Sequence, residues 1–212
     1  MTGTVSDVLH QAALEVGYGE SPAGSNRTKF AGEAGHPNGQ AWCATFVSAL
    51  MKRCHVNVPA GVLVPSSRTM YATAKQLGLS VPMSAVRAGD VVHMTRGAAR
   101  AWLGHVAIVE AVGPDGVHTI EGNTNGKGSA TGGSVLRHVR PYSAWNLGAW
   151  RPRYTQERRD LLLLPDGHIV AWRGEVVDGR RVVTHVGTIP EVEAMLRGGW
   201  VQYPYAGPVF YP

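Results

Sequence analysis

The sequence predicts an α+β fold, with helices first and an antiparallel sheet after them. Two patterns carry this prediction. Apolar residues recur at gaps of three and four through the first 80 positions, as they do on one face of a helix. Between positions 89 and 151 they alternate along short β-branched runs that are bounded by Gly, Pro, Asn and Asp. The overall composition, 44% apolar and 17% charged, is typical of a chain with a packed core.

Three helices are expected in the N-terminal half. They cover Val5–Val16, Cys43–Cys54 and Ser67–Leu77, and Gly17 and Gly78 act as stop signals after the first and the third. The polar stretch Tyr18–Phe30 is interpreted as a loop. Long ordered loops are often functional, so this one is expected either to form a wall of a substrate groove or to be plain surface.

Five strands are expected to follow the helices as an antiparallel meander. They are placed at 89–94 (with its entering turn), Gly104–Val112, Val117–Glu121, Ser134–Arg140 and Leu147–Arg151. A loop rich in Gly, Asn and Thr is expected at 122–133.

The composition changes after a charged bridge at 155–160, which separates a domain of residues 1–154 from a small β-rich unit at 161–212. Strands are expected there at 161–164, 169–172 and 181–186, a short helix at 190–197, and an irregular end at 200–212. Aromatic and arginine side chains suit carbohydrate or anionic-polymer binding, but they also suit packing of the unit's own small core. They are Trp172, Trp200, Tyr203, Tyr205, Phe210, Tyr211, Arg173, Arg180, Arg181 and Arg197.

Charge and cysteine content limit the surroundings of the protein. The net charge of +5 favours anionic partners such as a bacterial wall or nucleic acid, or simply serves solubility. The two cysteines stand 11 positions apart on one expected helix, roughly 16 Å, whereas a disulfide needs Cα atoms within about 7 Å. Two unbridged thiols fit synthesis in a reducing compartment. The N-terminus lacks a signal-peptide pattern, and no apolar run is long enough to span a membrane.

Cys43 is the candidate nucleophile, because it stands where a loop rich in Gly and Pro becomes a helix. The first N–H groups of a helix have no internal partner and lie at the positive end of the macrodipole. Both features favour a thiolate, and the same N–H groups can stabilise a developing oxyanion. The alternative is that Cys43 is a small buried core residue.

A nucleophilic cysteine needs a base and a group that orients the base. His105, early in an apolar strand, is the candidate base, and Glu121 and Asn123 at the end of the next strand are candidate orienting groups. A three-residue loop at 113–115 would place all three on one face of the sheet. A two-residue loop at 114–115 would place His105 on the opposite face, so the hypothesis requires an odd loop or a bulge. Zinc is the rival use of Cys and His, but no CxxC or HxxxH spacing occurs.

Four motifs in this order resemble the CHAP family (cysteine- and histidine-dependent amidohydrolase/peptidase). They are Trp42-Cys43-Ala44-x-Phe46-Val47, Ala88–Val92, Gly104–Val109 and Glu121–Thr124, within a likeness that spans about residues 5 to 151. The resemblance implies a papain-like fold and cleavage of peptidoglycan, often in phage lysins. It further implies that Cys43 is the nucleophile, His105 the base, Glu121 the orienting acid and Asn123 an additional orienting group. It does not reach residues 160–212.

The same resemblance implies two further site residues. The oxyanion donor is expected to be the Cys43 backbone N–H together with the Gln40 side chain. Trp42, which directly precedes the nucleophile, is grouped with Gln40 as an oxyanion or substrate residue. Some family members carry a calcium loop before the cysteine, but this chain lacks the acidic residues for it. No metal and no cofactor are expected.

The expected function is hydrolysis of peptidoglycan, as an N-acetylmuramoyl-L-alanine amidase or a wall endopeptidase. A free phage endolysin or a virion-associated lysin would fit, made in the host cytoplasm without a signal peptide and delivered to the wall through a holin or a virion. Nucleic-acid binding and membrane insertion are not expected. Two alternatives stay open: a non-enzymatic phage tail or structural protein with a CHAP-like scaffold, and a thiol amidase that acts on a substrate outside the wall.

Overall fold

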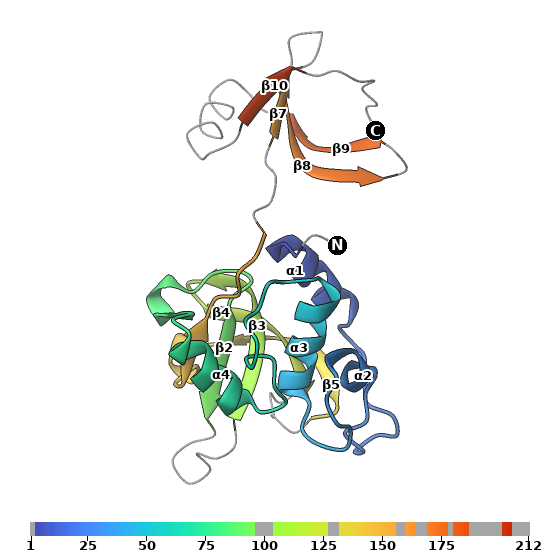
Figure 1. The fold of residues 1–212 in the computed structure, drawn as a ribbon, viewed down its shortest axis with the longest axis vertical. Coiled ribbons are helices and arrows are strands. Elements are labelled where there is room, and N and C mark those ends of the chain that lie inside the picture. Colours follow the sequence, from blue (N-terminus) through green and yellow to red (C-terminus); the bar gives the residue numbers. More distant parts are fainter. Residues whose placement is uncertain are drawn as a thin grey trace. The chain divides into compact units, whose positions relative to one another are not determined.

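The computed structural model describes residues 3–95, 104–126 and 132–155, together with the backbone of four strands beyond residue 159. The chain divides into two units, Met1–Thr155 and Gln156–Pro212. In the first unit helices precede an antiparallel sheet, which confirms the predicted α+β class (Figure 1).

The helices of the first unit are α1 (Val5–Leu14), α2 (Lys29–Ala34), α3 (Cys43–Arg53) and α4 (Ser67–Gln76), with 3-10 turns at Met83–Ala85 and Tyr142–Ala144. The three predicted helices are confirmed to within about one turn. The interpretation of 18–30 as continuous loop is wrong at its end, where α2 begins. This helix has only six residues, too few to show a period, and it is held by burial of Phe30 and Ala34.

The first unit contains a six-stranded sheet with the order β1-β6-β2-β3-β4-β5, in which every neighbouring pair is antiparallel. Its strands are β1 (Ser80–Val81), β2 (Val91–Thr95), β3 (Gly104–Gly113), β4 (Gly116–Thr124), β5 (Ser134–Arg140) and β6 (Gly148–Trp150). The five predicted strands are present. The additional strand, β1, is two residues long and too short to be recognised by alternation.

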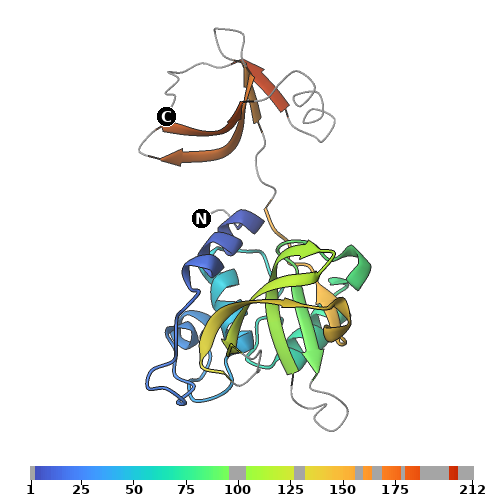
Figure 2. The same cartoon turned by 180° about the vertical axis from the view of Figure 1, so that it is seen from behind.

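Alternate residues of β3 belong to two apolar clusters, one on each face of the sheet. Val106 and Ile108 join the larger cluster, which contains the core-facing residues of α1, α2, α3 and α4. Ala107 and Val109 join a smaller cluster with Trp145. Helices α3 and α4 lie in front of the sheet in Figure 1, and a half-turn brings the green and yellow strands forward (Figure 2).

The second unit contains four described strands in the order β10-β7-β8-β9. They are β7 (Asp160–Leu163), β8 (Ile169–Val177), β9 (Arg180–Val186) and β10 (Val201–Pro204). The prediction of an irregular end is wrong at β10, which pairs in parallel with β7. Its aromatic and proline-rich sequence hid a strand whose partner lies 41 positions earlier. The expected helix at 190–197 and most of the charged bridge lie outside the described residues.

Both cysteines are free, as their spacing along α3 predicted. Within the described ranges, no helix has the length and apolar character that crossing a bilayer requires.

Candidate active site

Cys43 is the first residue of α3 and is almost fully buried. The N-cap residue, Trp42, makes no side-chain capping hydrogen bond, so no cap competes for the N–H groups of the first turn. The Cys43 sulfur instead receives the backbone N–H groups of Ala44, from its own helix, and Val106, from β3. The nucleophile candidate is therefore held between a helix N-terminus and a strand.

A glycine allows α3 to approach β4 closely. A Cβ atom on Gly122 would lie 2.6 Å from Phe46 Cβ and 2.9 Å from the Trp42 ring, which is nearer than real Cβ contacts allow. Gly122 directly follows Glu121 in β4. Because Gly122 has no side chain, the start of α3 can pack directly against β4, the strand that carries Glu121.

The pairing of β3 with β4 combines a two-residue loop with a bulge. The sequence alone could not decide between these possibilities. Gly113 pairs with Gly116, which is the two-residue loop that alone would separate the candidates. A bulge at Glu110 then shifts the pairing by one residue. The bulge brings His105 and Glu121 to one face.

The imidazole and carboxylate are joined by a buried hydrogen bond, 2.9 Å from His105 Nε2 to Glu121 Oε2, and both side chains are fully buried. Burial raises the pKa of the Glu121 carboxyl, but Arg140 and His105 lower it by more, to far below its usual range. Because the carboxylate is charged it accepts, so Nε2 carries the proton. Nδ1 is buried without a formed hydrogen bond to any described residue and is left to exchange a proton with Cys43.

The thiol and imidazole shift one another's ionisation. Burial raises the pKa of the Cys43 thiol, but His105 and the two backbone N–H groups lower it by more, so the net pKa lies below the ordinary thiol value. Burial lowers the pKa of His105, whereas Cys43 and Glu121 raise it, to about 9. Both shifts favour a thiolate–imidazolium pair at neutral pH. A hydrogen bond between a catalytic base and its nucleophile often tightens only in the complex with substrate.

Asn123 lies two residues beyond Glu121, at the end of β4, and is 1% exposed. Its φ of +57° places it in the left-handed region, within the irregular pairing between Glu121 and Thr124. Asn is among the few non-glycine residues that adopt this conformation readily. Its role as an additional orienting group stays a prediction.

The two residues expected at the oxyanion site differ in placement. Gln40 is exposed in the turn before α3, and its role stays a prediction. The Trp42 ring is 2% exposed, and its role at the oxyanion or substrate site stays a prediction. That ring stacks on Phe30 at 5.8 Å, and its Nε1–H donates to Glu20 Oε2 over 3.2 Å. Trp42 therefore belongs to the core that anchors the start of α3.

Sequence reasoning missed two polar residues that hold Glu121. Arg140 donates from Nε to Oε1 and from Nη2 to Oε2, both at 2.6 Å, and the Thr119 hydroxyl donates to Oε1 at 2.8 Å. Thr119 could have been found, because residues two apart on a strand share a face. Arg140 could not, because nothing in the sequence shows how far its side chain extends from β5.

Across the described stretches, no group of three or more His, Cys, Asp and Glu side chains is placed to hold a metal ion. The chemistry available to the site is that of a thiol, an imidazole and an anionic carboxylate in line, next to helix N–H groups.

This arrangement defines a candidate thiol site at the junction of a helix and an antiparallel sheet. Residues 35–123 match the family model described as the CHAP domain, a segment that includes Cys43, His105, Glu121 and Asn123. The match confirms the resemblance of this segment to the CHAP domain.

Solved structures with a similar chain trace include two proteins. One is described as a wild-type endolysin, LysIME-EF1, with 19% identity, a TM-score of 0.46 and coverage of 96% of this chain and 92% of that one. The other is Ly7917, with 17% identity, a TM-score of 0.43 and coverage of 87% and 94%; a second crystal structure of it is described as holding the hydrolyzing product of MDP. A search of curated proteins finds no match.

Proposed function

We propose that the protein is a peptidoglycan hydrolase that cleaves an amide bond with Cys43 as nucleophile. The observation that carries the proposal is the buried line of Cys43, His105 and Glu121 within the segment that matches the CHAP domain. A structural cysteine would need neither an imidazole beside it nor a charged carboxylate behind that imidazole. Burying charged groups carries a desolvation cost even when they are paired, and groups with such perturbed pKa values cluster at functional sites.

Each residue has a distinct part in the proposed reaction. The Cys43 thiolate attacks the amide carbonyl carbon, and the Cys43 backbone N–H, with Gln40 as the second donor, stabilises the oxyanion of the tetrahedral intermediate. His105 gives its Nδ1 proton to the departing amine, and the C–N bond breaks to leave a thioester. His105 then takes a proton from water, which attacks the thioester and restores the thiol. Glu121 keeps the imidazole oriented throughout.

The test is hydrolysis of purified bacterial wall, first in a zymogram and then with the products identified by mass spectrometry. Wild type and Cys54→Ala should clear the wall, while Cys43→Ala should not. The products distinguish an N-acetylmuramoyl-L-alanine amidase from an endopeptidase of the stem or cross-bridge peptide. A wild-type protein that clears no wall would contradict the proposal. It would point instead to a CHAP-like scaffold, or to an amidase on another substrate if small thioester or amide substrates are cleaved.

We further propose that residues 161–212 bind the wall rather than take part in the chemistry. The support is that these residues belong to a separate unit and that the sequence there is rich in aromatics and arginines. A fragment that ends at Asp160 should keep its rate on soluble muropeptides and lose affinity for intact wall. A fragment that is inactive on both would show that the second unit is needed for folding, which would contradict the binding role. Delivery to the wall through a holin or a virion is part of the same proposal.

A further inference from the structure

The Glu121 carboxylate receives four donors from three strands. His105 and Thr119 supply one each, and Arg140 supplies two parallel bonds that span both carboxylate oxygens. Glu121 is fully buried, and the Arg140 side chain is 17% exposed. A bidentate guanidinium–carboxylate pair fixes the plane of the carboxylate as well as its position. The direction in which Oε2 points at His105 is therefore set by Arg140.

A second arginine of the same strand shows what is particular to Arg140. Arg137 also donates to a glutamate, with its Nε 3.0 and 2.9 Å from the two carboxylate oxygens of Glu110. That pair lies at the surface, with side chains 50% and 29% exposed. Water can replace an exposed partner, but it cannot reach Glu121. Of these two pairs, only that of Arg140 holds a carboxylate that depends on protein donors in place of water.

We propose that Arg140 is a positioning residue of the catalytic site, which holds Glu121 charged and aligned so that His105 presents Nδ1 to Cys43. The inference rests on the proposed thiol chemistry of this site but not on the identity of its substrate. Removing Arg140 would leave Glu121 with Thr119 and His105 alone. The buried carboxyl would then bind a proton at a higher pH, and a neutral Glu121 no longer holds the imidazolium in place.

Several charged or titratable groups from the surrounding strands and α3 face His105 or Glu121. Cys43 and Glu121 have lowered pKa values, and that of His105 is raised to about 9. His93 on β2 accepts a hydrogen bond from the Trp150 indole N–H, and burial lowers its pKa to about 3, so it stays neutral. Burial also lowers the pKa of His138, on β5. Losing Arg140 raises the pKa of Glu121. A neutral Glu121 no longer supports the imidazolium that lowers the pKa of Cys43, so alkylation of Cys43 should begin at a higher pH, which moves the acid limb of its pH profile upward.

The experiment measures the rate at which iodoacetamide alkylates Cys43 as a function of pH, in a Cys54→Ala background of the full chain. For Arg140→Met we expect the acid limb to move up by about one pH unit or more. Hydrolysis should fall by on the order of 100-fold, because a displaced imidazole misaligns the reacting groups. Arg140→Lys keeps the charge without the two parallel bonds, so its acid limb should stay near wild type while hydrolysis falls about 10-fold.

Arg137→Met is the matched control, and both its rate and its pH profile should equal those of wild type. If Arg140→Met does not fold, Arg140→Lys and Thr119→Val carry the test, since Thr119→Val removes one bond to Glu121 without changing charge. It should lower hydrolysis severalfold with a small upward shift of the limb. An Arg140→Met protein with a lower melting temperature and an unmoved pH profile would overturn the proposal, as would an Arg140→Lys protein with wild-type hydrolysis. Because alkylation needs no wall, a shifted limb in a protein that cleaves no wall would uphold this inference and overturn only the proposed substrate.

Discussion

The two ends of α3 carry the same side chain in opposite chemical states. Cys43 begins the helix and its pKa is lowered, whereas Cys54 caps the other end and burial, followed by the charge of Asp7, raises its pKa to about 11. Both are buried, at 4% and 0% exposure. Burial therefore does not decide whether a cysteine of this helix ionises. What decides is whether N–H groups and an imidazole face the sulfur.

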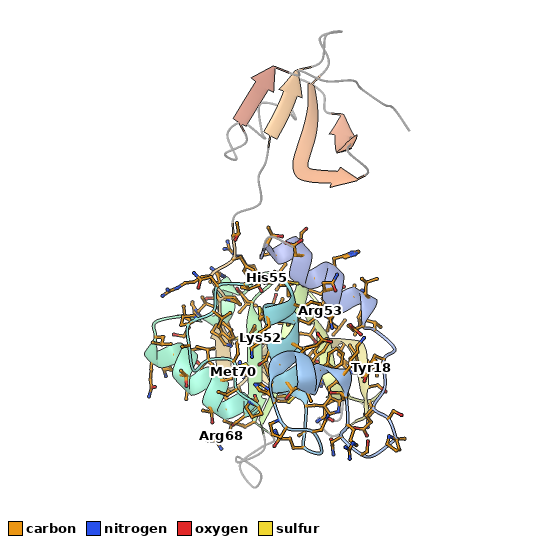
Figure 3. The ribbon with its side chains drawn as sticks, turned by 45° about the vertical axis from the view of Figure 1, so that its right-hand side comes forward. Tyr18, Lys52, Arg53, His55, Arg68 and Met70 are labelled. Carbon is orange, nitrogen blue, oxygen red and sulfur yellow. The ribbon has the colours of Figure 1, made fainter. Side chains whose placement is uncertain are left out.

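The surroundings of the two ends explain the difference. Cys43 meets the polar side chains of β3 and β4, while the chain near Cys54 is held by ion pairs of the neighbouring Arg53 with Glu15 and Glu33, each 2.7 Å long. Figure 3 labels Lys52, Arg53 and His55 at this C-terminal end. The negative end of the helix dipole and an apolar setting both oppose a thiolate there. The first end therefore favours the thiolate, and the second end favours the neutral thiol.

The largest expected effect is loss of the first thiol. Cys43→Ala should lower wall hydrolysis by more than about 10³-fold while leaving the melting temperature close to wild type, because it removes the nucleophile and little volume. Cys54→Ala should keep the wild-type rate and lose about 1 kcal/mol of stability through a small cavity. Turbidity clearing and thermal melting measure both. Equal losses of activity in the two variants would remove the distinction between the ends of α3.

A second prediction concerns the groups that make the first end reactive. His105→Ala should reduce hydrolysis about as much as Cys43→Ala, and Glu121→Gln by between about 10² and 10⁴, because an amide no longer fixes the imidazolium. Steady-state kinetics on soluble muropeptides measure these changes. A Glu121→Gln protein with unchanged kcat would contradict an orienting role for the carboxylate.

The pH dependence of hydrolysis and of stability tests the ionisation of His105 and Glu121. Hydrolysis should fall as pH rises through about 9, where His105 loses its proton. The stability that His105 gains from a folded pKa above its ordinary 6.5 is complete below 6.5 and is also lost as pH rises through about 9. Glu121 has a depressed folded pKa, so its contribution is present above about 4.5 and declines as pH falls. Hydrolysis rates and melting temperatures measured between pH 4 and 10 test these expectations. A rate that still rises at pH 10 would indicate that the reacting thiol has an unshifted pKa and no imidazolium partner.

The smallest expected effect comes from the close approach of α3 and β4. Gly122→Ala should force Phe46 and the start of α3 away from β4, costing about 1–3 kcal/mol and lowering hydrolysis. Gly32→Ala in α2 is the control, because nothing lies within 4 Å of its added Cβ, and it should be neutral or slightly stabilising. Differential scanning calorimetry compares the two. A Gly122→Ala protein as stable and active as Gly32→Ala would show that this contact does not position Cys43.

Most elements of the first unit could be predicted from the sequence, since the periods of α1, α3, α4 and the longer strands are clear over ten residues or so. The candidates Cys43, His105 and Glu121 also followed from sequence, because a helix start and two neighbouring strands limit which polar side chains can meet. The decisive register did not follow. It depends on a bulge at Glu110 that no local residue type signals.

Three other features depended on tertiary packing. The burial of the Trp42 ring and the hydrogen bond from its Nε1–H to Glu20 arise from contacts between segments 22 positions apart. The hold of Arg140 on Glu121 spans 19 positions. Helix α2 and strand β10 are too short, or too far from their partners, for periodicity to reveal them.

The most direct test of the central claim compares both thiols in one sample of the wild-type protein. Iodoacetamide labelling at pH 7, followed by peptide mass spectrometry, gives the alkylation rates of Cys43 and Cys54 side by side. The structure predicts that Cys43 reacts at least about 100-fold faster, because its pKa is lowered whereas that of Cys54 is raised to about 11. Equal rates, or faster labelling of Cys54, would contradict the assignment of α3's first residue as the nucleophile.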